Sequence, residues 1–439
     1  METLYIDNFR GFSDLFIPLK DVNFFVGENS TGKTSILSIL SLLSNDRFWY
    51  EQSFNDSDVQ LGNFKDIVSV DSKDKSNFKI GLINISEKAE KTFSFLLVFS
   101  EHEGRPYVTR FHFIIGESET SIYLSENIQY EFAIRKDIGS TMNYFVTLMK
   151  EWAQSKKHLK DVQTIEAEFS TKQEGLFYTI MNVQHEIYKK RSQPSKGVVW
   201  FRRSLSFTYV IREALSSVVW LAPIRSTPKR TYDDYRSEFS SDGKHIPYLI
   251  KKILGTTSEA SKFLEFVKNF GIDSGLMESL SIEKYGEDEY ISPFSLLVKL
   301  NNTKFNLKFV GYGVSQILPV LVEVFYRGKG SRYAIQQPEV HLHPRAQAAI
   351  GKIIHIMAFR DKKKFFIETH SDFMIDRFRA QLKKETGFVD SQVLFFCRKE
   401  NVNTITPISI DSVGQYDSNQ PREFREFFIN EELSNLGIR

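Results

Sequence analysis

Short apolar runs followed by polar clusters recur along the chain and predict buried strands that end in polar side chains. Residues 22–25 (VNFF) precede a glycine-rich loop, which is followed by Ile and Leu residues at helical spacing. Residues 331–337 and 364–367 have the same arrangement and lead into PEVHLHP and ETHSD. Because open α/β sheets bind ligands at the carboxyl ends of their strands, this pattern predicts an α/β fold with a site at that edge.

Two hairpins are predicted outside this sheet. Between residues 78 and 124, the runs FSFLLVF and YVTRFHFII flank the turn segment EHEGRP, which is typical of an antiparallel hairpin. Between residues 280 and 310, the runs SLLVKL and KFNLKFV are separated by Asn301, Asn302 and Thr303, a hairpin signal.

Helices are predicted where mixed charged and apolar residues run on with few breaks. Residues 125–215 have almost no Gly or Pro before residue 192, and residues 244–272 have a similar pattern. We therefore expect a first segment, 1–124, with the glycine-rich loop and a β-subdomain, a helical insertion at 125–215, and a second segment, 216–439, that completes the same domain.

Composition narrows the class of protein. With 439 residues, 41% of them hydrophobic and 14% aromatic, the chain is expected to fold into two or three globular lobes. The net charge of +2 gives no overall indication of a nucleic-acid partner. The single cysteine, Cys397, favours a reducing cytoplasm, and the absence of a secretion signal or a long apolar run predicts a cytoplasmic protein without membrane association.

The glycine-rich loop matches the phosphate-binding loop in the strand, loop and helix context that this motif requires. Its glycines allow backbone N–H groups to surround phosphate oxygens, Lys33 reaches the β and γ phosphates, and the Thr34 hydroxyl is a ligand for Mg²⁺. The predicted nucleotide-binding residues are Gly27, Glu28, Asn29, Ser30, Thr31, Gly32, Lys33, Thr34 and Ser35.

A second anion site is predicted in FVGYGVSQILP, where two glycines and a serine precede an apolar helical run. Gly311, Gly313, Ser315 and Gln316 would present backbone N–H groups and a hydroxyl at the amino end of a helix, which attracts anions.

The ordered motifs NFRGF, GENSTGKTS, LGNFKDI, LAPIRSTPKRTY, GYGVSQILP, QQPEVHLHP and ETHSD resemble the ABC-type ATPase domain of OLD-like, RecF-like and related bacterial AAA-family proteins. The resemblance implies ATP and Mg²⁺ as cofactors. It places the segment from Gly311 to Gln316 where these ATPases have the signature that caps the γ-phosphate held by another subunit, and it matches His370 to their switch histidine. It therefore implies a homodimer or higher oligomer that shares its ATP sites.

One departure from the family pattern concerns catalysis. Gln336 and Gln337 stand where the family usually has two acidic residues, one for the Mg²⁺ shell and one for the attacking water. A glutamine carries no charge and does not accept the proton, so hydrolysis is expected to be slow. Glu339 is our first candidate for the acid/base, and Glu368 is the second; Gln337 and His370 complete the catalytic set, and Gln336 joins Thr34 as a candidate Mg²⁺ contact.

Several of these residues also have structural interpretations. Glu339 could cap the helix that follows the HLHP turn. His341, His343 and His370 could bind zinc, although hydrogen bonding at the turn is the simpler role for His341, and for His343 both roles stay open. Arg10, near the phosphate loop, could contact the base or ribose of a nucleotide, or it could be a surface cation. Arg225 and Arg230, after a predicted strand, could contact a phosphate or a neighbouring subunit, or they could form surface ion pairs.

Two functions are compatible with these residues. The chain is similar to stand-alone ATPases of defence systems such as PARIS and Septu, which favours an oligomeric sensor or scaffold in anti-phage defence that controls a separately encoded effector. The alternative is a RecF-like repair or chromosome-maintenance ATPase that binds DNA. No fused nuclease signature is apparent, and a transporter subunit is disfavoured by the chain length and the insertion.

Overall fold

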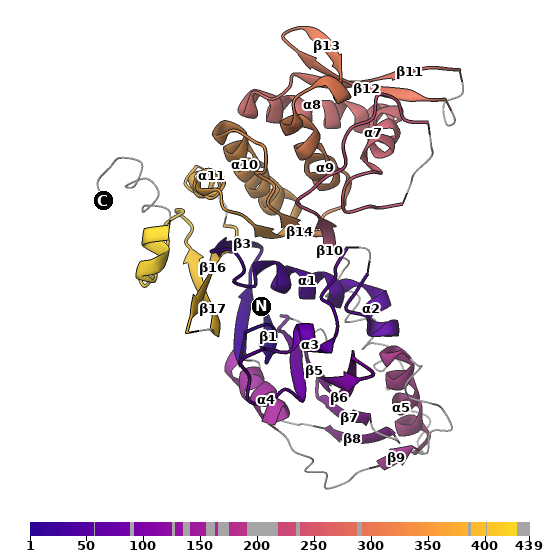
Figure 1. Cartoon of the computed structure of the whole chain (residues 1–439), viewed down its shortest axis with the longest axis vertical. Helices are drawn as coiled ribbons and strands as arrows, with labels where there is room; N and C mark the ends of the chain where they lie inside the picture. Colours follow the sequence, from indigo (N-terminus) through magenta and orange to yellow (C-terminus); the bar gives the residue numbers. More distant parts are fainter. Residues whose placement is uncertain are drawn as a thin grey trace. The chain divides into compact units, whose positions relative to one another are not determined.

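The computed structural model describes residues 1–427 except 57, 88–91, 125–127, 135–140, 155–162, 166–174, 191–217, 234–237, 288–291, 385–387 and 401. The chain forms two compact units, each assembled from separate segments (Figure 1). The first unit comprises Met1–Lys20, Asn29–Val218 and Phe396–Ile405, and the second comprises Asp21–Glu28, Val219–Phe395 and Thr406–Arg439.

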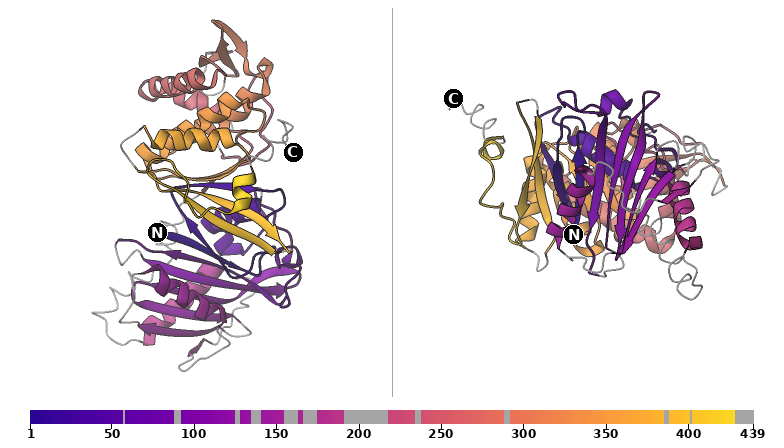
Figure 2. Two further views of the ribbon diagram at one scale, coloured as in Figure 1. Left: turned by 90° about the vertical axis from the view of Figure 1, so that its left-hand side faces the viewer. Right: turned by 90° about the horizontal axis from the view of Figure 1, so that it is seen from below.

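The first unit contains an antiparallel sheet, whose strands lie side by side in the right-hand view of Figure 2. Within the described residues its strand order is β2-β1-β4-β5-β6-β7-β8-β9. These strands are β1 (Glu2–Asp7), β2 (Leu15–Leu19), β4 (Asn77–Asn84), β5 (Phe93–His102), β6 (Arg105–Ile115), β7 (Ser118–Leu124), β8 (Ile128–Ile134) and β9 (Gln163–Ile165). The β5–β6 pair is the hairpin predicted between residues 78 and 124, and it is confirmed.

Alternation along β5 explains how this sheet is covered on both faces. Leu96 and Val98 are fully buried against helix α4 (Met142–Gln154), together with Met149 of that helix. Phe95, one residue out of phase, packs instead on Trp49 of α2 (Asp46–Glu51), with ring centroids 5.5 Å apart. Successive side chains of a strand point to opposite faces of the sheet, so the single apolar run of β5 packs against α4 on one face and against α2 on the other.

The prediction that residues 125–215 are helical was only partly right. Helices α4 and α5 (Leu176–Lys190) lie in this range, but β8 and β9 extend the sheet instead. In β8, buried Ile128 and Tyr130 alternate with less buried neighbours, and backbone pairing with β7 stabilises this short segment as a strand. The SQPSKG segment at 192–197 lies outside the described residues.

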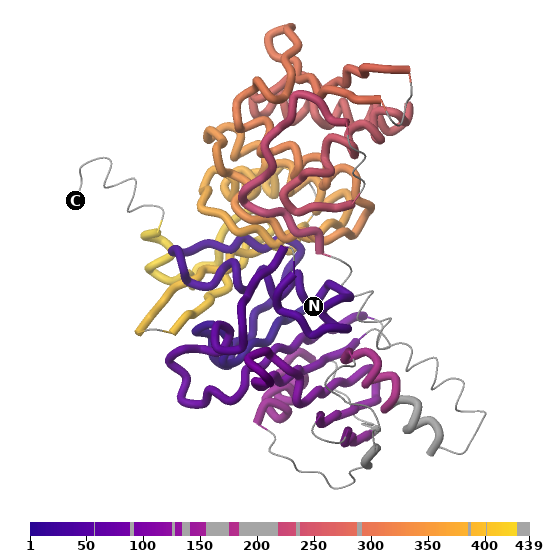
Figure 3. The backbone as a smooth tube through the Cα atoms, turned by 45° about the vertical axis from the view of Figure 1, so that its right-hand side comes forward, coloured from indigo at the N-terminus to yellow at the C-terminus, as the bar shows by residue number. Residues whose placement is uncertain are grey.

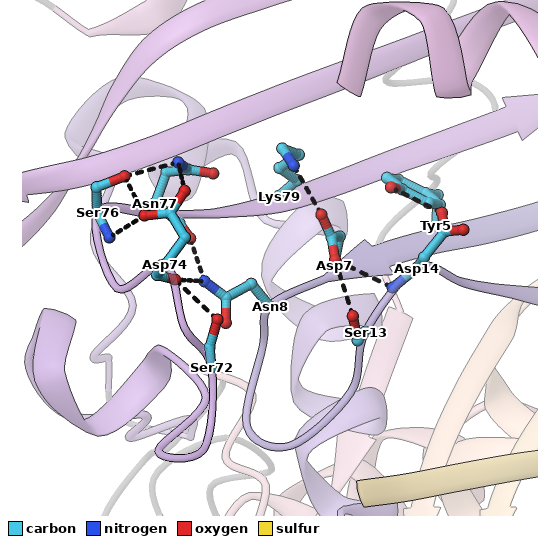
Figure 4. Close-up of polar contacts among 10 residues, drawn as sticks. All are labelled: Tyr5, Asp7, Asn8, Ser13, Asp14, Ser72, Asp74, Ser76, Asn77 and Lys79. Carbon is cyan, nitrogen blue, oxygen red and sulfur yellow. Dashed lines mark hydrogen bonds and ion pairs between the residues drawn. The ribbon is translucent and has the colours of Figure 1, made fainter. Parts of the chain in front are cut away.

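Polar contacts fix the turn that follows β1 (Figure 4). The Asp7 carboxylate pairs with Lys79 at 2.7 Å on one side and accepts a 3.0 Å hydrogen bond from the Asp14 amide on the other. The Asn8 side chain donates to the carbonyls of Asp74 and Asn77, each at 2.6 Å. These contacts hold the NFRGF turn between β1 and β2 in place.

The second unit contains most of the sheet β10-β14-β15-β3-β16-β17, in which the segment Phe396–Ile405, shared by β16 and β17, is assigned to the first unit. Its strands are β10 (Val218–Leu221), β14 (Arg332–Gln336), β15 (Lys364–Glu368), β3 (Val22–Gly27), β16 (Ser391–Lys399) and β17 (Val402–Ile410). The pairs β14–β15 and β15–β3 are parallel, and their residues are almost all buried. The three strands predicted from the short apolar runs are therefore confirmed, and they are neighbours.

Helices and a small antiparallel sheet complete this unit (Figures 1 and 3). The helices are α7 (Ile246–Gly255), α8 (Thr257–Ser274), α9 (Tyr312–Tyr326), α10 (Pro344–Asp361) and α11 (Asp372–Leu382). The small sheet has the order β11 (Ser279–Lys284), β12 (Phe294–Leu300) and β13 (Thr303–Asn306). Asn301 and Asn302 both have positive φ at the β12–β13 turn, so the hairpin predicted there is confirmed.

The α/β fold class with an antiparallel β-subdomain, predicted from the sequence, is the fold observed. Among the described residues, no helix is both long and apolar enough to cross a membrane.

Candidate functional site

Three parallel strands of the second unit end at the same level. Gln336 at the end of β14 is in register with Glu368 at the end of β15, and Glu368 is in register with Phe25 of β3. The Gln337 amide then donates to the Glu368 carbonyl at 2.8 Å, and the Thr369 amide donates to the Phe25 carbonyl at 3.1 Å. The polar segment after β15 therefore lies beside the strand that leads into the phosphate loop, and the segment after β14 lies next to it, one strand further away.

Glu339 is anchored at this edge through one carboxylate oxygen. Its Oε1 accepts a 2.7 Å hydrogen bond from the His370 amide, while its Oε2 is buried and has no hydrogen-bond partner among the described residues. Burial raises the pKa of the Glu339 carboxyl above its ordinary value, and hydrogen bonds from the His370 amide, the Glu339 amide and the Thr369 side chain partly offset that rise. A carboxylate with a raised pKa and an oxygen atom that is open to a new hydrogen bond has the properties of a general base.

Two glutamines precede Glu339 at the end of β14. The Gln336 side chain is buried and donates to Glu368 Oε2 at 3.4 Å. Gln337 has a φ of 40°, which is uncommon for a residue with a side chain, and a 3.2 Å hydrogen bond from the Val340 amide to its carbonyl closes a turn. That turn brings Glu339 back toward His370, so Gln336, Gln337, Glu339, Glu368 and His370 are brought together within one unit.

The neighbouring histidines have separate environments. His343 occupies the N-cap position of α10, so capping is not the role of Glu339 in this structure. The His341 ring lies 5.9 Å from the Tyr312 ring, and the His370 side chain is exposed. No group of three or more potential metal ligands is found in the described part of the chain.

The phosphate loop has the backbone that its sequence requires. Gly27, Ser30 and Gly32 all have positive φ, and α1 (Lys33–Ser44) begins immediately afterwards. A Cβ on Gly32 would lie 2.5 Å from the Phe12 ring, so only glycine fits there. Lys33 is buried, with 4% exposure, and Thr34 is exposed at the first turn of α1.

Three side chains outside the motif support this loop in the first unit. Arg398 Nη2 donates to the Ser30 carbonyl at 2.7 Å, and Arg398 Nε donates to Asn403 Oδ1 at 2.9 Å. Asn403 in turn donates to the Arg10 carbonyl at 3.0 Å, and Arg10 Nη1 donates to the Ser35 hydroxyl at 3.2 Å. Arg10 thus contacts α1 rather than projecting into solvent as a surface cation.

The signature-like segment lies at the amino end of α9, as predicted. Gly311 is its N-cap residue and is exposed, and a Cβ there would meet nothing within 4 Å. Gly313 is closely packed, because a Cβ would lie 3.3 Å from the His341 carbonyl. The Ser315 hydroxyl donates to the Tyr312 carbonyl at 2.9 Å, and Gln316 is buried with 6% exposure, so neither side chain projects freely from the helix end.

The two arginines after β10 differ in environment. Arg225 is buried with 3% exposure, and its Nη2 lies 3.4 Å from the Gln336 carbonyl, whereas Arg230 is exposed. The sequence indicates both as possible phosphate contacts and offers no means to separate them.

The parallel sheet, the phosphate loop before α1 and the acidic cluster at the carboxyl edge together define a P-loop nucleotide-binding protein. Residues 1–375 match the model of the AAA ATPase domain family. The chain therefore belongs to this ATPase family, which accounts for most of its length.

Solved structures similar to the chain are heads of SMC proteins. They include an SMC head bound to the C-winged helix domain of ScpA (12% identity, 93% of this chain and 98% of that chain, TM-score 0.43). Others are an SMC head from Pyrococcus yayanosii (10% identity, 98% and 100%, TM-score 0.42) and one from Thermotoga maritima (9%, 92% and 97%, TM-score 0.36). No curated protein matches the chain.

Proposed function

We propose that the chain is an ATP-binding and ATP-hydrolysing subunit of a bacterial anti-phage defence complex. In this role it is an oligomeric sensor or scaffold that controls a separately encoded effector, such as a nuclease. The observation that carries the enzymatic part of this proposal is the buried Glu339 carboxylate, anchored by the His370 amide and with one oxygen uncommitted.

Nucleotide binding is assigned to the segment from Gly27 to Ser35. Its positive-φ positions at Ser30 and Gly32 turn successive N–H groups in one direction, which suits a phosphate, and Lys33 supplies the positive charge. Mg²⁺ would be held by the Thr34 hydroxyl and the Gln336 amide oxygen, both of which are oxygen donors, and it would neutralise the phosphate charge.

In the hydrolysis of ATP to ADP and phosphate, Glu339 accepts the proton of the attacking water. Gln337 orients that water, and His370 contacts the γ-phosphate. Neither Gln336 nor Gln337 carries a negative charge, so the pair stabilises the metal ion and the attacking water less than two carboxylates would, and turnover is slow. Slow turnover suits a switch that holds ATP more than it suits a motor.

The defence role is supported by the near-neutral charge, which disfavours a DNA clamp, and by the resemblance to stand-alone defence ATPases. The signature-like residues Gly313, Ser315 and Gln316 are assigned to the ATP site of a second copy. An effector would then respond to the assembly that ATP holds together.

The experiment that tests this proposal measures the mass of the assembly with and without ATP, and DNA binding at several salt concentrations. Wild type is expected to form an ATP-dependent oligomer and to bind duplex DNA no better in ATP than without it, while Lys33→Ala stays in the nucleotide-free state. Tight, salt-sensitive, ATP-dependent DNA binding would contradict the defence role and support a RecF-like clamp.

A further inference from the structure

A buried arginine at the edge of the parallel sheet has fewer hydrogen-bond partners among the described residues than its N–H groups can use. Arg225 follows β10, the neighbour of β14, and is 3% exposed. Its hydrogen bond to the Gln336 carbonyl is long at 3.4 Å, and its Nε and Nη1 have no hydrogen-bond partner among the described residues. A buried cation in this state is costly, so a binding partner for its free N–H groups would lower the free energy of the site.

The backbone holds Arg225 firmly in this position. On one side of it the Ala222 amide donates to the Ser241 carbonyl at 3.2 Å, and on the other the Ser226 amide donates to the Asp242 carbonyl at 2.7 Å. Its neighbour Ile224 is 83% exposed, so the chain turns the charged residue inward and the apolar one outward. This is the reverse of what burial energetics alone favours.

A charge of opposite sign, that of Glu339, acts on Arg225. The Glu339 charge raises the pKa of Arg225, but burial has the larger effect and lowers it to about 10, so the guanidinium keeps its proton at neutral pH. Glu339 also has an uncommitted oxygen, Oε2. Two opposite charges therefore lie near each other, and each retains uncommitted polar atoms.

We propose that Arg225 is a binding residue for the γ-phosphate of ATP, acting from within the same chain. This inference rests on the proposed ATPase function. Its uncommitted N–H groups match phosphate oxygens, and its contact with the Gln336 carbonyl places it at the carboxyl end of β14, two strands along the sheet from β3, which leads into the phosphate loop.

The pairing with Glu339 gives this cation a part in hydrolysis. A phosphate oxygen of ATP accepts a hydrogen bond from Arg225, and the attacking water donates one to Glu339. ATP and water together therefore supply hydrogen-bond partners for both charged side chains. As the new P–O bond forms and the bond to the β-phosphate oxygen breaks, Glu339 takes the water proton and Arg225 stabilises the charge on the transferred group. A positive charge near the phosphate also offsets part of the loss caused by Gln336 and Gln337.

The test compares the affinity for ATP with the affinity for ADP, which lacks the γ-phosphate. Variants are Arg225→Met, which keeps the length of the side chain without its charge, and Arg225→Lys, which keeps the charge without the planar donors. Arg230→Met is the matched control, because Arg230 is exposed on the same loop. Melting without nucleotide shows whether each variant is folded.

In Arg225→Met we expect at least a tenfold loss of affinity for ATP, little change for ADP and a loss of phosphate release. Arg225→Lys is expected to fall between wild type and Arg225→Met, and it carries the test if Arg225→Met does not fold. Equal loss of ATP and ADP affinity, or no loss of either, would overturn the role of Arg225. Nucleotide binding that survives Lys33→Ala would instead overturn the proposed ATPase site, so the two failures are distinguishable.

Discussion

Arg398 contacts the phosphate loop from a position 368 residues further along the chain. It donates hydrogen bonds to the Ser30 carbonyl and to the Asn403 side chain, and Asn403 in turn donates to the Arg10 carbonyl. Ser30 has a φ of 62°, a conformation that costs a non-glycine residue about 1 kcal/mol or more. Contacts from outside the motif therefore help to keep the loop in its binding shape.

Replacing Arg398 tests this support. Arg398→Ala removes the hydrogen bond to Ser30 and the one to Asn403, and the loop must then be ordered by ATP itself. Because the side chain is partly exposed, we expect a loss of about 1 kcal/mol, which is roughly a fivefold weaker affinity for ATP in a titration. Arg422→Ala, which breaks an exposed pair with Glu426, is the control and should leave affinity unchanged.

Glu339 gives a prediction about stability and pH. Burial raises its pKa in the folded chain, so the folded state binds the proton more tightly than the unfolded state does. The ionised carboxylate therefore lowers stability increasingly as pH rises above the ordinary glutamate pKa of about 4.3. Glu339→Gln should melt at a higher temperature than wild type at pH 8, and the difference should shrink as pH falls toward 4. A variant that is less stable than wild type at pH 8 would contradict this interpretation.

Residues of the site could be predicted only where a motif contains them. The glycines and Lys33 follow from the spacing of the phosphate loop, and Glu339 follows from the search for a carboxylate near two glutamines. The contact between Glu339 and the His370 amide, the inward direction of Arg225 and the support from Arg398 depend on residues that are remote in sequence. Spacing carries no information about such contacts, and only the folded chain brings these residues together.

At the scale of elements, helix α4 shows how an amphipathic segment stabilises the antiparallel sheet. Its buried residues include Met149 and Trp152, which pack against β5 and β6. The Trp152 indole stacks on His112 with 5.8 Å between centroids and donates to Glu119 at 2.7 Å. One face of the sheet is thus covered by this single amphipathic helix among the described residues.

Truncating Met149 should destabilise the first unit. It is fully buried, and a Cβ on Gly81 of β4 would lie 2.8 Å from its sulfur, so the packing here is tight. Met149→Ala is expected to cost about 2–4 kcal/mol in denaturant unfolding, from lost burial and the cavity left behind. Thr147→Ala, on the exposed side of the same helix, should change stability by less than about 0.5 kcal/mol.

Elements with a strong local pattern were predicted correctly, and strands that depend on pairing with a neighbouring strand were not. The strands β3, β14 and β15 are continuous apolar runs bounded by polar clusters, a pattern typical of strands buried in a parallel sheet. The strands β8 and β9 are stabilised by pairing with a neighbouring strand, as in the register between β7 and β8. Pairing partners are not visible in a local pattern, so the whole range from 125 to 215 was predicted to be helical.

At the scale of the whole molecule, the signature segment of one copy is expected to complete the phosphate loop of another. Gly311 allows this to be tested without damage to the fold, because it is exposed, has a φ of −55° and has open space where a Cβ would be. A large cation at this position should block assembly of the shared site while leaving the single chain intact.

Mixing two inactive variants tests the shared site. Lys33→Ala lacks a phosphate contact and Gly311→Arg lacks a free signature segment, so each alone should release little phosphate. Mixed together they can form an oligomer with one intact loop facing one intact signature, and part of the activity should return. Gly328→Arg, also in open space but at the other end of α9, should be active alone. No recovery on mixing, with both variants folded, would contradict the shared site.

The central claim is that this chain hydrolyses ATP with Glu339 as the base, and phosphate release by the purified protein tests it most directly. We predict slow but measurable release by wild type, with losses of about a hundredfold or more in Lys33→Ala and in Glu339→Gln. Release by Glu339→Gln at the wild-type rate would contradict the assignment of the base, and ATP-dependent assembly without any release by wild type would show a scaffold held by nucleotide instead of an enzyme.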